Sequence, residues 1–272
     1  MAKTCTGCAA TIPNGKNRCV MCGSYNWEND IVENKVIKFS DIKEKATTYI
    51  HCGPWNGTLS AQGGLVAGFV YLLGGFPGGG KSTFCLQCLE HVGSGIYVSA
   101  EESAEDVRDR ADRIGFSHHD YVDFYDALED CSIGHLMQEN WQGLIILDSL
   151  QALGNKNDDD TVTFLRLCKV WAQHSKSPVI IINHATKDDP LAGLQAFQHW
   201  VDCTLSLVAP IEGKPERVLT VHKNRKGPTV TLKLWMTEQG LSVTQHGTQR
   251  LQGVTPRLSQ GRTRNPAKGG TE

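Results

Sequence analysis

The chain has 272 residues, of which 40% are hydrophobic and 21% are charged, an ordinary composition for a globular protein. With 27 Lys and Arg residues against 29 Asp and Glu residues, the formal net charge is −2, which excludes a globally basic surface and makes any contact with nucleic acid local. Residues Met1–Cys5 contain no apolar signal segment, and the longest apolar stretch, Leu65–Leu73, is far shorter than the roughly 18 residues that span a membrane. We therefore expect a cytoplasmic protein without a membrane partner.

Two Cys-x-x-Cys pairs lie near the N-terminus, Cys5 with Cys8 and Cys19 with Cys22. Four thiolates at this spacing are typical ligands of a structural Zn²⁺ ion, and the alternative is four unligated thiols. A segment of fewer than about 40 residues rarely buries enough core to fold alone, and zinc supplies the missing stability. The sequence therefore predicts a zinc finger over residues 1–28, followed by a connector over 29–62.

Residues 63–243 show the pattern of an α/β domain, in which short apolar runs alternate with amphipathic stretches. The apolar runs predict buried strands at Val66–Leu73, Ile96–Ser99, Leu144–Leu147 and Val179–Asn183. The stretches between them predict helices at Lys81–Val92, Ser103–Ile114 and Thr161–His174, the last one preceded by an exposed loop over 158–160. Strands that alternate with helices favour a mainly parallel sheet covered on both faces.

The last part of this domain has a different pattern. Three runs joined by short turns, Val201–Val208, Arg217–His222 and Thr229–Met236, predict an antiparallel extension of the sheet. Residues 244–272 then form a tail that carries five basic residues against one acid; these are Arg250, Arg257, Arg262, Arg264 and Lys268 against Glu272. Such a tail is either a disordered solubilising end or an arm that binds DNA.

The strongest motif is the segment Gly75–Ser82, Gly-Phe-Pro-Gly-Gly-Gly-Lys-Ser, which matches the P-loop pattern G-x-x-x-x-G-K-[ST]. Glycines let backbone N–H groups wrap the phosphates of ATP, and the following helix presents its positive end. Lys81 is expected to reach the β- and γ-phosphates, and the Ser82 hydroxyl to ligate Mg²⁺. The predicted nucleotide-binding residues of this segment are Gly75, Gly78, Gly79, Gly80, Lys81, Ser82 and Thr83.

Carboxylates follow two of the predicted strands. Asp148 comes directly after Leu144–Leu147, where Mg²⁺ at a P-loop finds its second protein anchor, and capping of the next helix is the alternative role. Glu101 and Glu102 follow another strand, and we expect one of them, Glu101 in preference to Glu102, to activate the attacking water. The alternative is that both only begin the next helix, where acidic residues suit the helix dipole.

Six elements occur in an order that resembles a known family. They are the four-cysteine finger ending in Cys22–Trp27, the P-loop, Tyr97–Ser103 (Tyr-Val-Ser-Ala-Glu-Glu-Ser), Leu147–Gln151 (Leu-Asp-Ser-Leu-Gln), His184–Asp188 (His-Ala-Thr-Lys-Asp) and Lys223–Arg225 (Lys-Asn-Arg). Over about residues 1–241, the chain resembles the bacterial RadA (Sms) DNA-repair ATPases, which are relatives of RecA and DnaB. The P-loop is highly specific by itself, whereas the other elements are specific as an ordered set.

The resemblance implies a RecA-like P-loop ATPase core preceded by the small zinc finger, with ATP, Mg²⁺ and Zn²⁺ as its ligands. It also implies a homo-hexameric ring that binds ATP between subunits and moves on single-stranded or branched DNA. Such rings act in branch migration or as helicases at recombination intermediates, with a RecA-type recombinase as a partner.

Roles for individual residues follow from the resemblance by position. His184 is expected to sense the γ-phosphate, and Thr186 and Lys187 to begin a loop that faces the DNA channel. Lys223 and Arg225 match the family's Lys-Asn-Arg-Phe-Gly motif and are expected to act catalytically on the nucleotide of the neighbouring subunit, as trans-acting cations do in GTPases. The alternatives are a plain strand-end histidine at 184 and a solvated turn at 223–225.

The chain also departs from the family pattern. Lys226 stands where the family has Phe, Ala9 stands where Gly is usual, and the channel-loop segment includes the acidic run Asp188-Asp189. The family's C-terminal Lon-protease-like domain has no counterpart in the sequence, so we expect a short form of the family. Two other functions fit these residues. One is a KaiC-like ATP-driven switch or assembly factor that acts on a protein partner, and the other is a DnaB-like replicative helicase.

Overall fold

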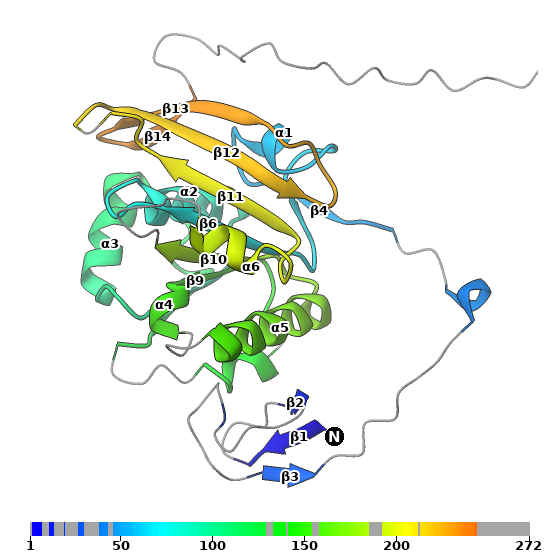
Figure 1. Ribbon diagram of the computed structural model, residues 1–272. Helices are drawn as coiled ribbons and strands as arrows, with labels where there is room; N and C mark the ends of the chain where they lie inside the picture. The colour runs from blue at the N-terminus through cyan, green and yellow to red at the C-terminus, as the bar shows by residue number, and fades with distance from the viewer. Residues whose placement is uncertain are drawn as a thin grey trace, which may run out of the picture.

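The computed structural model describes residues 2–6, 11–13, 19, 27–29, 38–42, 46–128, 133–139, 141–153, 158–184, 192–211 and 213–243. A nine-stranded sheet forms the body of the molecule, with strand order β14-β13-β12-β11-β6-β10-β9-β7-β8 (Figure 1). Its parallel strands are β6 (Val70–Gly75), β7 (Gly95–Ser99), β8 (Val122–Asp126), β9 (Leu144–Asp148), β10 (Val179–His184) and β11 (Cys203–Val208). The antiparallel extension consists of β12 (Glu216–Asn224), β13 (Thr231–Thr237) and β14 (Gly240–Ser242).

Helices cover both faces of this sheet. The longer ones are α2 (Lys81–Val92), α3 (Ala104–Arg113) and α5 (Asp158–Ser175), and the shorter ones are α1 (Asn56–Leu59), α4 (Leu150–Leu153) and α6 (Ala192–Phe197). Two 3-10 turns, η1 (Phe39–Asp41) and η2 (Leu136–Gln138), and the small ladder of β4 (Tyr49–Ile50) with β5 (Leu65–Val66) complete this part of the chain. The predicted mainly parallel α/β fold with an antiparallel extension is confirmed.

Alternation along the central strands divides the core into two layers. Ile181 packs with residues of α4, α5 and α6, whereas its neighbours Ile180 and Ile182 pack on the opposite face with α2 and α3. Successive side chains of a strand point to opposite faces, so a continuous apolar run such as β10 buries both faces at once. The second layer also includes Trp55 and Leu59, which precede the domain boundary predicted at residue 63.

Local signals explain where the elements begin and end. The Ser103 hydroxyl caps α3 by accepting the Asp106 N–H at 3.2 Å, and α2 ends at Gly93 in the left-handed conformation. The predicted strand Val66–Leu73 is divided, because the chain turns between β5 and β6 with Phe69 N–H bonded to the Val66 carbonyl. The loop predicted over 158–160 is instead the first turn of α5, where acidic residues suit the helix dipole.

The N-terminal residues form a separate three-stranded antiparallel sheet of order β2-β1-β3, made of β1 (Ala2–Cys5), β2 (Thr11–Pro13) and β3 (Trp27–Asn29). Cys5 and Cys19 are both buried, whereas Cys8 and Cys22 lie outside the described residues, as does the basic tail over 244–272. The zinc finger and the other domain boundaries stay predictions. Within the described part of the chain, every helix is too short or too polar to cross a bilayer.

Candidate nucleotide-binding and catalytic site

The P-loop connects the end of β6 to the start of α2 in the middle of the sheet. Gly75 and Gly80 adopt positive φ angles of +148° and +98°, and a Cβ atom would lie 2.2 Å from the Leu207 carbonyl oxygen at the first and 2.5 Å from Met236 Cε at the second. Only glycine fits this backbone path. The first intrahelical bond of α2 runs from Phe84 N–H to the Gly80 carbonyl at 2.9 Å, so the N–H groups before Phe84 face the ligand side of the helix terminus.

The Lys81 ammonium is held inside this loop. Its Nζ donates to the carbonyls of Gly75 at 2.8 Å and Phe76 at 3.0 Å, and the residue is only 4% exposed. Burial lowers the pKa of Lys81, while the charges of Asp148 and Glu101 oppose that shift. A buried, loop-anchored cation beside free helix N–H groups suits the phosphates of a nucleotide.

Asp148 ends β9 beside the P-loop, and its Oδ2 accepts two hydroxyl bonds. Ser82 Oγ donates at 2.9 Å and the buried Tyr97 hydroxyl donates at 2.6 Å. Burial raises the pKa of Asp148, and the bonds from Tyr97 and Ser82 counteract the rise. A hydroxyl and a carboxylate in direct contact are a hard oxygen donor set, so these residues fit a Mg²⁺ ion at the phosphates.

The two adjacent glutamates have different surroundings. Glu101 Oε2 lies 2.8 Å from His184 Nε2, and its Oε1 accepts the Ser149 hydroxyl. These contacts, His184 first, lower the pKa of Glu101 against the effect of burial. Glu101, Asp148 and His184 lie at the carboxyl ends of β7, β9 and β10. Each contributes one side-chain oxygen or nitrogen, and these three atoms lie within 4.8 Å of one another. Glu102 instead pairs with Arg110 of α3, whose second guanidinium nitrogen donates at 2.7 Å.

Two residues of this site were not identified from the sequence. Gln151 of α4 donates to Asn183 Oδ1 at 2.6 Å and to the His184 carbonyl at 3.1 Å, and its Oε1 accepts the His184 N–H at 3.1 Å. It thereby fixes the end of β10 that carries His184. Tyr97 is the other, and a tyrosine inside an apolar strand is a usable signal because its hydroxyl needs a buried partner.

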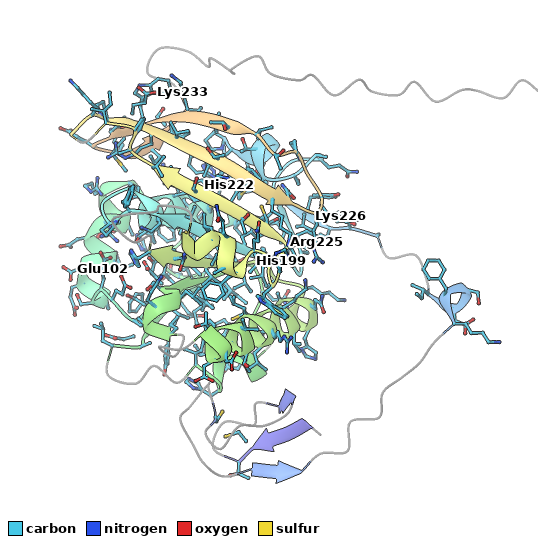
Figure 2. All side chains as sticks on the ribbon, in the orientation of Figure 1. Glu102, His199, His222, Arg225, Lys226 and Lys233 are labelled. Atoms are coloured by element: carbon cyan, nitrogen blue, oxygen red, sulfur yellow. The ribbon has the colours of Figure 1, made fainter. Side chains whose placement is uncertain are left out.

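Lys223 and Arg225 lie at the end of the central strands opposite the P-loop. The register pairs Asn224 with Cys203 and Cys203 with Tyr71, near the start of β6, whereas the P-loop follows the end of β6. In Figure 2, Arg225 and the exposed Lys226 lie on the side of the molecule opposite Glu102. These cations are therefore remote from the phosphate loop of their own chain.

Local bonds hold both cations in place. Lys223 Nζ donates to the carbonyls of Val201, at 2.9 Å, and Gln198, and burial together with Arg225 lowers the pKa of Lys223. Arg225 NH1 lies 3.6 Å from Asp202 Oδ1. Thr186 and Lys187 lie outside the described residues.

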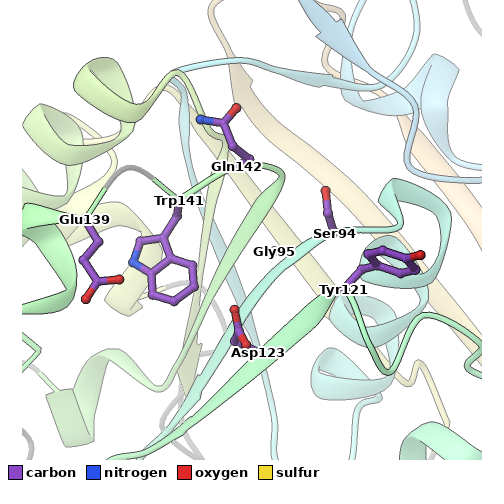
Figure 3. A pocket seen from close by; sticks show the side chains of 7 residues that line it. All are labelled: Ser94, Gly95, Tyr121, Asp123, Glu139, Trp141 and Gln142. Carbon is purple, nitrogen blue, oxygen red and sulfur yellow. The ribbon is translucent and has the colours of Figure 1, made fainter.

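A pocket of about 350 Å³ lies elsewhere, at the N-terminal ends of β7, β8 and β9 (Figure 3). It is lined by Ser94, Gly95, Tyr121, Asp123, Glu139, Trp141 and Gln142. Ligands of open α/β sheets bind at the carboxyl ends of the strands, so this pocket is distinct from the nucleotide site.

Comparison with known proteins agrees with this geometry. A family model described as "ATPase: KaiC" matches residues 56–130. DNA repair protein RadA of Haemophilus influenzae is 28% identical over 270 residues, covering 88% of this chain and 58% of the relative. DNA repair protein RadA of Escherichia coli is 29% identical over 275 residues, covering 88% and 59%. The chain thus spans less than two thirds of the length of these relatives.

Two solved structures share the fold. The RadB recombinase superposes with a TM-score of 0.54 at 20% identity, covering 66% of this chain and 93% of that one. A KaiC-like protein from Pyrococcus horikoshii gives a TM-score of 0.58 at 18% identity, covering 72% and 98%. Fold and site together define a P-loop ATPase with a RecA-like core. Over 88% of its length, the chain is similar to the RadA DNA repair proteins.

Proposed function

We propose that the protein is an ATP-hydrolysing motor that acts on single-stranded or branched DNA in recombination and repair, assembled as a homo-hexameric ring. The observation that carries the proposal is the distance of Arg225 and Lys223 from their own P-loop, along the length of the central strands. In a head-to-tail ring, residues at that end of the strands in one subunit serve the site at the carboxyl ends of the strands in the next. The names of the RadA relatives support the assignment to DNA repair.

Within each site the residues divide the work. Lys81 and the N–H groups at the start of α2 bind the phosphates of ATP. Mg²⁺ held by Ser82 and Asp148 would neutralise charge on the phosphates. Glu101, kept ionised by its lowered pKa, orients the attacking water and accepts its proton as the bond to the γ-phosphorus forms and ADP leaves. Arg225 from the neighbour stabilises the negative charge of the transferring group.

His184 connects this chemistry to DNA. In the sequence it lies two residues before Thr186, and its ring contacts Glu101. DNA bound by Thr186 and Lys187 would displace the end of β10 and thereby change the position of His184 relative to Glu101. We therefore expect DNA to stimulate hydrolysis.

The N-terminal sheet is proposed to be a zinc finger. Cys5 and Cys19 are buried, and each is the first cysteine of a Cys-x-x-Cys pair. Four thiolates would hold Zn²⁺ in a closed structural site, whose role is to stabilise a segment too small to fold alone.

The experiment is steady-state ATP hydrolysis by the full chain, with and without single-stranded DNA at low salt. A several-fold stimulation is expected, and it should weaken as salt rises because binding to phosphates releases counterions. The control is Lys81→Ala, which should abolish turnover under both conditions. A measurable rate that DNA leaves unchanged would refute the motor.

That last outcome would favour a second function, an ATP-driven switch that acts on a protein partner. The match of residues 56–130 to the KaiC ATPase model favours it specifically. In a pull-down with this chain as bait, a partner protein would then be retained in the presence of ATP and released with ADP, whether or not DNA is present.

A further inference from the structure

Arg217, near the start of β12, contacts the P-loop of its own subunit. Its Nε donates to the Gly79 carbonyl at 3.2 Å, and its NH1 donates to the carbonyls of Lys214 at 2.6 Å and Glu216 at 2.9 Å. Within the described residues, Arg217 forms no ion pair with a carboxylate, whereas the adjacent Glu216 pairs with Lys233 at 3.1 Å. The guanidinium of Arg217 therefore donates to three backbone carbonyls and has no carboxylate partner among the described residues. Its contacts hold the backbone in place and do not neutralise an acidic side chain.

The anchored peptide is one that must be oriented for phosphate binding. Gly79 N–H already closes a turn with the Phe76 carbonyl at 3.1 Å, so the Gly79 carbonyl is the remaining polar group of that residue. The C=O and N–H of one peptide unit point in opposite directions because the unit is planar and trans. A carbonyl drawn toward Arg217 therefore turns the N–H of Gly80 toward the other side of the loop.

Close packing around Gly79 also restricts the conformation of the P-loop. A Cβ atom on Gly79 would lie 3.0 Å from the Phe76 carbonyl oxygen and 3.1 Å from that of Leu207, so the loop packs closely on the end of β11. Arg217 holds it from β12, the next strand of the sheet.

We propose that Arg217 is a positioning residue of the phosphate site, one that presets the Gly79–Gly80 peptide for the phosphates of ATP and ADP. The proposal rests on the assignment of the P-loop as the nucleotide site. It makes Arg217 a cis-acting counterpart of Arg225: one residue shapes the site of its own subunit, and the other completes the site of the next.

The test measures binding of fluorescent ADP and ATP analogues, and kcat and KM for ATP, in the full chain. Arg217→Met should weaken binding of both nucleotides and raise KM by about tenfold, the loss typical of a hydrogen bond with a charged partner. The value of kcat should change by less than about twofold, because the carbonyl contact is the same before and during phosphoryl transfer. Arg217→Lys, which keeps one donor and the charge, should recover most of the affinity.

Lys233→Met is the matched control, because it removes a cation from the same hairpin without touching the loop. It should leave binding unchanged. Wild-type affinity in Arg217→Met would overturn the proposal, as would an equal loss in Lys233→Met or a failure of Arg217→Lys to recover affinity, since the residue would then only hold the hairpin. If wild-type protein failed to bind nucleotide, or Lys81→Ala bound as well as wild type, the nucleotide-site assignment itself would be wrong.

Discussion

Asp202 offers a stability prediction that the structure allows to be worked through. This carboxylate is 3% exposed, its Oδ2 accepts the Val70 N–H at 3.1 Å, and its Oδ1 accepts Lys169 Nζ at 2.8 Å. Asp202→Ala leaves the N–H at the start of β6 without its acceptor, at a cost of about 1–3 kcal/mol. The Lys169 side chain is 26% exposed, so water compensates part of the lost ion pair.

Together these terms lower the free energy of unfolding by about 3 kcal/mol, which corresponds to roughly 6–12 °C in Tm for a domain of this size. Urea unfolding followed by circular dichroism measures this loss of unfolding free energy. The slope of the free energy against urea concentration should be unchanged if the variant unfolds in two states. Asp123→Ala, an exposed carboxylate on β8, is the control and should change stability by less than about 0.5 kcal/mol. A loss below about 1 kcal/mol in Asp202→Ala would refute this reasoning, because the cost of burying the carboxylate would then offset most of what its bonds contribute.

Three further predictions concern the site and the finger. Glu101→Gln should reduce kcat by about 10²–10⁴-fold with nucleotide binding retained, whereas Glu102→Gln should stay within a few-fold of wild type; equal losses in kinetic assays would contradict the division of roles. Lys81→Ala and Arg225→Ala subunits should each be inactive alone but should recover up to about a quarter of wild-type turnover when mixed equally. The Lys81→Ala subunit supplies an intact Arg225, and the Arg225→Ala subunit supplies an intact P-loop. No recovery would contradict action in trans. Metal analysis of the purified chain should find one zinc ion per chain, and chelation should unfold the N-terminal segment while the ATPase core keeps its Tm.

Much of the fold follows from local sequence. The P-loop and helix α2 coincide with their predicted bounds, because the glycines, the cap at Gly93 and the apolar spacing all act within a few residues. Strand β8 was missed, because all its residues are at intermediate or exposed positions and two of them are aspartates, so no apolar run marks it.

Outside the P-loop, the sequence predicted those site residues that directly follow a strand, but not the residues that position them. Glu101 and Glu102 are adjacent, so the sequence gives only a weak preference for Glu101, and the Ser99 hydroxyl that accepts the Glu102 N–H at 3.0 Å helps set which carboxylate faces the P-loop. The partners of Tyr97, Gln151 and Arg217 lie in segments far apart in the chain, so local sequence does not identify them.

Strand β12 has a consequence for how chains of this kind can vary. It carries Arg217 near one end and leads into Arg225 at the other, and at about 3.3 Å per residue the two lie roughly 26 Å apart. Inserting or deleting one residue between them would turn every later side chain to the opposite face of the sheet. The strand itself therefore fixes the spacing between Arg217, which contacts the P-loop of its own chain, and Arg225, the cation proposed to act on the neighbouring subunit.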